Sequence, residues 1–228
     1  MTACGCTEAH ERERIVLTGG PGAGKTAVLE MVRHTLCEHV LILPEAATIV
    51  FGGGFPRREE RESRRAAQRA IFHVQRELEA IGDVPRPAVV LCDRGTVDGL
   101  AYWPGPPQDF WAATGTDPRD EFARYDLVVH LRTPIIGYDH ANPLRVETAA
   151  AAAAIDAHLE KAWRGHPRRV LVEPTGDFLD KARSVVALLL AELPECCSSN
   201  LESSLRRQNH PAPAAPPAAP PAAPDSGR

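Results

Sequence analysis

The chain has 228 residues, 43% of them hydrophobic, and a formal net charge of −4. This length suits one α/β domain with some additional tail. The negative balance excludes a global basic field of the kind that attracts nucleic acid or an anionic membrane, so we expect neither as a partner. The polar N-terminus shows no export signal and the six cysteines form no regular framework, which together predict a cytoplasmic protein.

Short apolar segments alternate with helical patterns along most of the chain. In chain order, we predict a strand at 14–18, a helix at 25–37, a strand at 40–43, a helix at 57–81, a strand at 88–92, a short helix at 109–113, a strand at 126–131, a helix at 147–163, a strand at 169–172 and a helix at 177–193. Continuous apolar strands between helices are typical of a parallel sheet covered on both faces. The sequence therefore predicts an α/β fold with a five-stranded, mostly parallel sheet between layers of helices.

The long helix predicted at 57–81 is amphipathic. Its apolar side chains recur at helical spacing, and its first half mixes arginine and glutamate densely. We expect that charged half to be a solvated face with ion pairs along the helix. The residues expected to face the core are Ala67, Ala70, Ile71, Val74, Leu78 and Ile81.

Composition divides the chain into three parts. Residues 1–13 are expected to be a disordered N-terminal segment, and residues 14–194 to form the domain. Residues 210–224 contain almost only proline and alanine. Because such a segment buries too little surface to fold, residues 195–228 are predicted to be a disordered tail.

One glycine-rich motif follows the first predicted strand. It reads Gly19-Gly20-Pro21-Gly22-Ala23-Gly24-Lys25-Thr26 and matches the pattern G-x-x-x-x-G-K-[ST] in full. Glycines let the backbone amides wrap phosphate groups, and the following helix directs its positive end toward them. Lys25 is expected to reach the β- and γ-phosphates of ATP, and the Thr26 hydroxyl to bind Mg²⁺. Lys25 is one of only three lysines, which makes a chance match less plausible.

Two further strands end in charged residues. Asp93 closes the third strand, where it could hold Mg²⁺ or accept a proton, or could be a simple turn residue. Arg94 follows where many hydrolytic P-loop ATPases carry a glutamate, which favours transfer to a bound acceptor over hydrolysis. Glu45 follows the second strand and is a candidate general base, or else a helix N-terminal carboxylate.

Other candidates lie after the fourth and fifth strands and in the aromatic insertion. Arg145 falls where small-molecule kinases carry a mobile lid arginine, although a surface arginine is the alternative. Thr175 to Asp177 could receive a nucleotide base, or Asp177 could simply cap the last helix. The aromatic side chains could stack on an acceptor or form a local core; they are Tyr102, Trp103, Phe110 and Trp111.

With these motifs in place, the sequence resembles NadR-like AAA-domain proteins, relatives of nicotinamide-riboside-kinase domains and deoxynucleoside kinases. The resemblance covers about 14–193 and rests on the glycine motif and on 44–47, 93–95, 98–102, 138–140 and 142–145. It implies a P-loop α/β/α fold, with Glu45 as general base, Asp93 serving the metal and Arg94 the acceptor. Some relatives are described as nucleotide-binding regulators.

Two functions remain open from the sequence. The first is an ATP- and Mg²⁺-dependent kinase that acts on an unidentified, nucleoside-like small molecule. The second is a nucleotide-dependent regulatory protein without kinase turnover. The combination of Glu45, Asp93 and Arg145 favours the kinase, because a simple nucleotide binder needs only the glycine motif. The sequence does not name the acceptor, choose between ATP and GTP, or give the oligomeric state.

Overall fold

The computed structural model describes residues 10–37, 39–83, 87–134, 148–174 and 177–195. Five strands form one sheet in the order β2-β3-β1-β4-β5, and each neighbouring pair is parallel. This confirms the predicted parallel five-stranded sheet. The strands are β1 (Glu13–Thr18), β2 (Val40–Leu43), β3 (Val89–Asp93), β4 (Leu127–Leu131) and β5 (Arg169–Val172).

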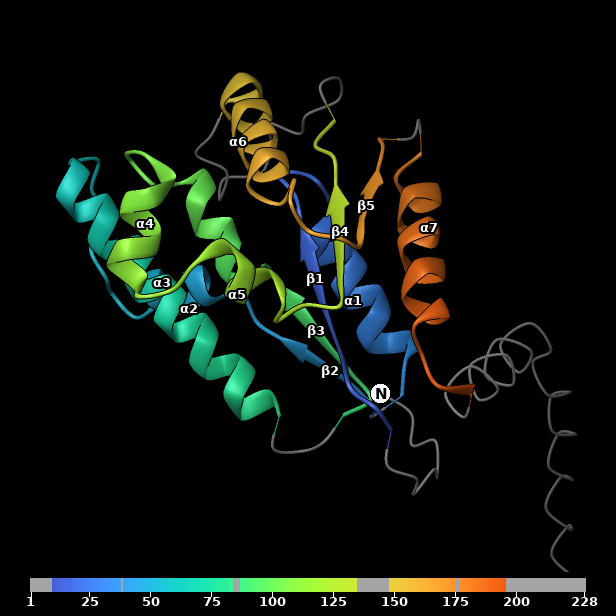
Figure 1. The fold of residues 1–228 in the computed structure, drawn as a ribbon. Coiled ribbons are helices and arrows are strands. Elements are labelled where there is room, and N and C mark those ends of the chain that lie inside the picture. The colour runs from blue at the N-terminus through green and yellow to red at the C-terminus, as the bar shows by residue number, and fades with distance from the viewer. Residues whose placement is uncertain (1–9, 38, 84–86, 135–147, 175–176, 196–228) are drawn as a thin grey trace, which may run out of the picture.

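Helices cover both faces of the sheet (Figure 1). On one face, α1 (Lys25–Thr35) and α7 (Phe178–Ala191) pack against strand residues such as Ile15 and Leu17. Val16, between them in sequence, belongs to the core on the opposite face. This alternation follows from the period of two in a strand. The elements on that second side are α2 (Ala46–Gly52), α3 (Arg61–Gly82), η1 (Thr96–Ala101), α4 (Pro107–Thr114), α5 (Pro118–Phe122) and α6 (Ala149–Ala162).

The carboxyl ends of all five strands lie at one edge of the sheet, the edge nearer α6 (Figure 1). The chain runs from β1 outward to β2, returns to β3, and then crosses to β4 on the other side of β1. In open parallel sheets, ligands bind outside the carboxyl ends of the strands where the winding direction changes. The glycine motif follows β1 and therefore lies at this switch point.

The buried face of α3 agrees with the predicted one only in part: Ala67 is buried and Leu78 packs against the core, but polar residues share this face. The helix begins at Arg61, and its buried residues include Gln68, Phe72, Gln75 and Glu79, whereas Ile81 is 66% exposed. Apolar periodicity missed part of this face because polar side chains occupy it. The hydroxyl of Tyr125 donates to Glu79 at 2.7 Å, and the Gln75 amide donates to the same carboxylate at 2.9 Å.

Two predictions on local packing are resolved. Trp103, Phe110 and Trp111 are buried together in the core, so these three form a local core, whereas Tyr102 is only partly buried, with Arg94 5.7 Å from its ring centroid. The Asp177 side chain accepts a hydrogen bond from the Leu179 amide, which confirms it as the cap of α7. None of the helices in the described ranges is long and apolar enough to cross a bilayer. Residues 1–9 and 196–228, with most of the predicted N-terminal segment and tail, lie outside the described residues.

Candidate functional site

The loop between β1 and α1 has a backbone that requires glycine at two positions. Gly19 has φ +139°, and a Cβ there would lie 2.1 Å from the carbonyl oxygen of Leu131. Gly24 has φ +96° immediately before α1. Within the described part of the chain, no hydrogen bond occupies the backbone amides of Gly22 and Gly24. The loop is therefore a cradle with free amide donors, which fits the phosphate groups of a nucleotide.

Lys25 lies within this cradle. Its ammonium donates to the carbonyl oxygens of Gly19 at 2.8 Å and Gly20 at 3.3 Å. Burial lowers the pKa of Lys25 to about 8, although the nearby carboxylates of Asp93 and Glu45 oppose the shift. Thr26 follows in the first turn of α1 and is exposed. A buried cation whose partners are only carbonyl oxygens is suited to neutralising a polyphosphate.

The outer side of the loop is tied to two helices. Asp156 on α6 accepts from the Gly20 amide at 2.9 Å, and its Oδ1 also lies 3.0 Å from Nε2 of His130. Lys181 on α7 donates to the carbonyl oxygens of Ala23 at 3.0 Å and Arg132 at 2.5 Å. These contacts hold the cradle in place before any ligand binds.

Sequence reasoning assigned no role to Asp156 or Lys181, yet both left a signal. Asp156 is the one carboxylate among Ala152, Leu159 and Trp163, which otherwise form the buried apolar stripe of α6. Lys181 is one of three lysines in the chain and falls four and eight residues before Val185 and Leu189, on the buried face of α7. A charge on a buried face needs partners, and here the partners are the glycine loop and the strand end beside it.

Asp93 closes β3 next to Lys25. One of its carboxylate oxygens, Oδ1, is buried without a hydrogen-bond partner among the described residues. Burial raises the pKa of Asp93 to about 6; Glu45 and Asp98 add to the shift, and Lys25 and Arg94 oppose it. A free carboxylate oxygen beside a phosphate cradle fits Mg²⁺, which prefers oxygen ligands. The residues available to hold the ion are Asp93 and Thr26.

Arg94 has a left-handed backbone with φ 73°, the only positive φ at a non-glycine residue in the described part of the chain. Its Nε donates to Oε1 of Glu45 at 2.6 Å, and its Nη1 donates to Oδ1 of Asp98 at 3.2 Å. Burial alone would raise the pKa of Glu45, but Arg94 and the Thr48 hydroxyl hold it below its ordinary value. Arg94 thus combines a left-handed backbone with a side chain that bridges Glu45, which follows β2, and Asp98, which follows β3. Residues with such backbone strain cluster at functional sites.

Asp98 holds the Arg94 side chain in position and is itself held by three further contacts. It is 3% exposed, and its carboxylate accepts from the Thr18 hydroxyl, the Gly95 amide at 2.9 Å and Nε1 of Trp163 at 3.1 Å, in addition to Arg94. Every lone-pair direction of the carboxylate is therefore used. The sequence indicated Asp98 only as part of a family-like segment, although its spacing of four from Arg94 was visible.

A cavity of about 540 Å³ opens beside the glycine loop. Its wall includes Pro21, Glu45, Arg94 and Asp98 at the strand edge, and residues of α2, α3 and η1 farther out. Gln68 on α3 lines the cavity and is only 9% exposed. Its side-chain amide makes no hydrogen bond within the described residues. Pockets of this size hold small molecules.

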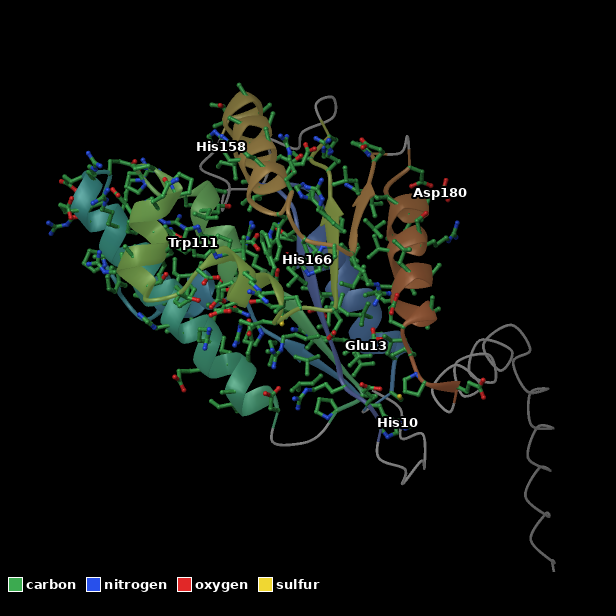
Figure 2. All side chains as sticks on the ribbon, viewed as in Figure 1. His10, Glu13, Trp111, His158, His166 and Asp180 are labelled. Atoms are coloured by element: carbon green, nitrogen blue, oxygen red, sulfur yellow. The ribbon has the colours of Figure 1, made fainter. Side chains whose placement is uncertain are left out.

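The structure brings together most of the residues singled out from sequence. Lys25, Asp93, Glu45 and Arg94 influence one another electrostatically, and Glu45 and Arg94 are in direct contact. Arg145 lies outside the described residues. A second titrating cluster, in which burial and Glu192 raise the pKa of Glu13 to about 7, lies at the opposite end of the sheet (Figure 2). It belongs to no part of this site.

The glycine cradle after β1, with its buried lysine at the switch point of a parallel sheet, defines a P-loop nucleotide-binding protein with a kinase-like fold. Residues 14–181 match the model of an AAA-domain family, and the chain belongs to that family. None of the curated proteins matches the sequence. Among solved structures, thymidylate kinase from Candida albicans is similar, with a TM-score of 0.56 and 12% identity over 79% of this chain and 91% of that one. At this identity, the likeness shows the fold alone.

Proposed function

We propose that this protein is a Mg²⁺-dependent ATP phosphotransferase that phosphorylates a small, nucleoside-like acceptor. The observation that carries the proposal is the cavity beside the P-loop, whose wall holds both Glu45 and Arg94. A protein that only binds a nucleotide needs no second pocket next to the phosphates. A kinase needs one, because catalysis of phosphoryl transfer consists largely of positioning the acceptor in line with the γ-phosphate and stabilising charge.

In this proposal, each residue of the site has a distinct role. The unoccupied backbone amides of the Gly19–Thr26 loop, including those of Gly22 and Gly24, bind the triphosphate together with the ammonium of Lys25. Thr26 and Asp93 hold Mg²⁺, which supplies charge neutralisation on the phosphates. Glu45 accepts the proton of the acceptor hydroxyl. Arg94 orients Glu45 through their 2.6 Å contact and faces the acceptor cavity. Arg145 is proposed to add positive charge at the transferring group.

Hydrolysis and regulation are the competing functions. The Asp93-Arg94 pair supports transfer, because no carboxylate follows Asp93 to activate water. The regulatory alternative requires nucleotide binding without turnover, so the two functions differ in their products.

The test is a thermal-shift screen of nucleosides and vitamins with Mg²⁺ and a non-hydrolysable ATP analogue, followed by transfer assays with ATP on each stabilising compound. The kinase proposal expects a phosphorylated acceptor, and Lys25→Ala should abolish its formation. If wild-type protein phosphorylates none of the stabilising compounds and releases only free phosphate or nothing, the regulatory or hydrolytic function replaces it.

A further inference from the structure

We infer that the outer part of the acceptor cavity is an anion-binding subsite formed by Arg57, Arg58 and Arg64, so that the acceptor carries a phosphate or carboxylate group away from the hydroxyl that receives the phosphoryl group. The inference rests on the proposed function in one respect: it treats the cavity as the acceptor site. It narrows the substrate class from neutral nucleoside-like molecules to acidic ones.

The first observation is that these three arginines lack acidic partners. All three line the cavity, and none of them makes an ion pair anywhere in the described part of the chain. Neighbouring Arg65, in contrast, has two acidic partners: Glu62 on the same helix at 4.0 Å, as the sequence pattern predicted, and Asp109 of α4 at 2.5 Å. The ion-paired face expected for the charged segment therefore forms at Arg65 and not at the cavity.

The second observation is that two of the three guanidinium groups are held by contacts that leave their charge uncompensated. Arg57 lies over the Phe51 ring, 4.5 Å from its centroid. Arg64 donates to the carbonyl oxygen of Tyr102 at 3.1 Å. An aromatic face and a carbonyl orient a cation but do not neutralise it. Both side chains are therefore placed to bind an anion without first breaking an ion pair.

The third observation concerns the balance of charge along the cavity. Arg94, at the inner end, already contacts the carboxylates of Glu45 and Asp98. At the outer end, three guanidinium groups share the wall with one carboxylate, that of Glu59. The outer cavity is therefore positive in a chain whose net charge is −4. Clefts lined by one sign of charge concentrate ligands of the opposite sign.

The three arginines lie on different chain segments from Glu45, the proposed base at the inner end of the cavity. Glu45 immediately precedes α2, and Arg57 and Arg58 follow the end of that helix. The N-terminal end of α3, which carries Arg64, lies at the edge of the molecule away from β1 and α1 (Figure 1). One turn along α3 from Arg64, the buried side chain of Gln68 lines the wall, and among the described residues its amide group has no hydrogen-bond partner. The cavity thus offers a neutral polar group and a cationic mouth, which fits an elongated ligand with a terminal anion.

The test uses full-length protein saturated with Mg²⁺ and a non-hydrolysable ATP analogue, so that added anions do not occupy the P-loop. Nucleosides and sugars are titrated beside their monophosphates by calorimetry. We expect at least one monophosphate to bind about tenfold or more tightly than its parent, with the difference shrinking as salt is raised. The double variant Arg58→Gln/Arg64→Gln should remove the difference. Arg61→Gln, a change of the same charge on a residue outside the cavity wall, should retain it.

The outcomes separate this inference from the proposed function. The same compounds are then assayed for transfer with ATP in place of the analogue. Transfer to a neutral acceptor that binds as tightly as its phosphorylated form would overturn the anion subsite and leave the kinase standing. Preferential, arginine-dependent binding of monophosphates without any transfer from ATP would support the subsite and count against the kinase. A panel in which no monophosphate binds more tightly than its parent, or a double variant that keeps the preference, overturns the inference.

Discussion

At the scale of single residues, the ligand-free site is electrostatically strained. Lys25 and Asp93 both have pKa values moved toward their neutral forms, to about 8 and about 6, because both charges are buried. Neither finds a full partner in the protein: Lys25 contacts carbonyl oxygens, and one oxygen of Asp93 has no partner among the described residues. Such groups reduce stability until a ligand of opposite charge arrives.

Replacing Asp93 by asparagine should therefore stabilise the ligand-free protein. The pKa of Asp93 is raised in the fold, so its ionised form carries a cost that grows as pH rises from about 4 through about 6 and is complete above that. We expect Asp93→Asn to gain about 1–3 kcal/mol in unfolding free energy at pH 7.5, and much less at pH 4.5. Denaturant titrations at the two pH values measure this. A gain in unfolding free energy that is equal at the two pH values, or absent at both, would contradict this prediction.

The same variant should bind Mg²⁺-ATP more weakly, with partial recovery at high Mg²⁺.

Lys25 allows a second test at the same scale. Lys25→Ala should leave the domain folded but weaken triphosphate binding by about 100-fold or more, because it removes the cation inside the cradle. In the wild type, affinity should also decline above about pH 8, where ligand-free Lys25 loses its proton. Calorimetric titration across pH 7–9.5 measures both effects. Unchanged affinity in a folded Lys25→Ala protein would remove Lys25 from the site.

Glu45 distinguishes catalysis from binding. Because Arg94 and Thr48 hold its pKa below the ordinary value, Glu45 stays ionised at neutral pH and remains able to accept a proton. Glu45→Gln keeps the shape and removes the base, so turnover should fall by about 10²–10⁴ while ATP affinity is retained. Transfer assays on an acceptor found by screening decide this, with Thr48→Ala as a milder control that removes only one hydrogen bond to Glu45. A wild-type rate in Glu45→Gln would exclude the assignment.

At the scale of elements, apolar patterns predicted the strands of the sheet well and the buried face of the long helix only in part. The central strands β1, β3 and β4 are largely buried, and the partly buried edge strands β2 and β5 are also continuous apolar runs that begin and end where predicted. The buried face of α3 contains Gln75 and Glu79. Gln75 donates to Glu79 within the helix, but the other partners of Glu79, which are Tyr125 and Arg124, come from a distant segment. No local pattern indicates that Tyr125 will reach a carboxylate in α3. The left-handed backbone of Arg94 escaped prediction for a similar reason, since Glu45, one of the two carboxylates that hold its side chain, lies 49 residues away in the sequence.

Mutations on α3 can test which of its faces is buried. Glu79 is fully buried and accepts hydrogen bonds from Gln75, Tyr125 and Arg124. Glu79→Ala should destabilise the domain by about 3–5 kcal/mol, because it removes the acceptor of the buried Gln75 and Tyr125 donors and, within the described residues, leaves Arg124 with only its ion pair to Glu121. Ile81→Ala, on the exposed side, should change stability by less than about 0.5 kcal/mol. Urea unfolding of the two variants compares them directly. A larger loss of stability in Ile81→Ala than in Glu79→Ala would instead support the buried face expected from apolar periodicity.

At the scale of the whole molecule, the sheet order explains why sequence reasoning located much of the site. Residues that directly follow strands meet at one edge of a parallel sheet whatever the strand order, which is why Glu45 and Asp93 could be assigned to the same site as the glycine motif. The supports Asp156 and Lys181 project from helices on opposite faces of the sheet, and their convergence on the loop depends on how those helices pack. Packing of that kind is a property of the assembled layers and of no single segment.

The proline- and alanine-rich segment allows a last prediction at this scale. Its composition offers too little apolar surface to repay the entropy of ordering it, so it should contribute nothing to the core formed by the five strands and their helices. Deleting residues 209–228 should therefore leave the melting temperature within about 1 °C of the full chain, since even 1 kcal/mol would shift it by about 2–4 °C. Nucleotide affinity should also stay the same. Calorimetric melting and ATP titration of the shortened and full-length proteins provide the comparison. A drop of several degrees would mean that the segment packs against the domain.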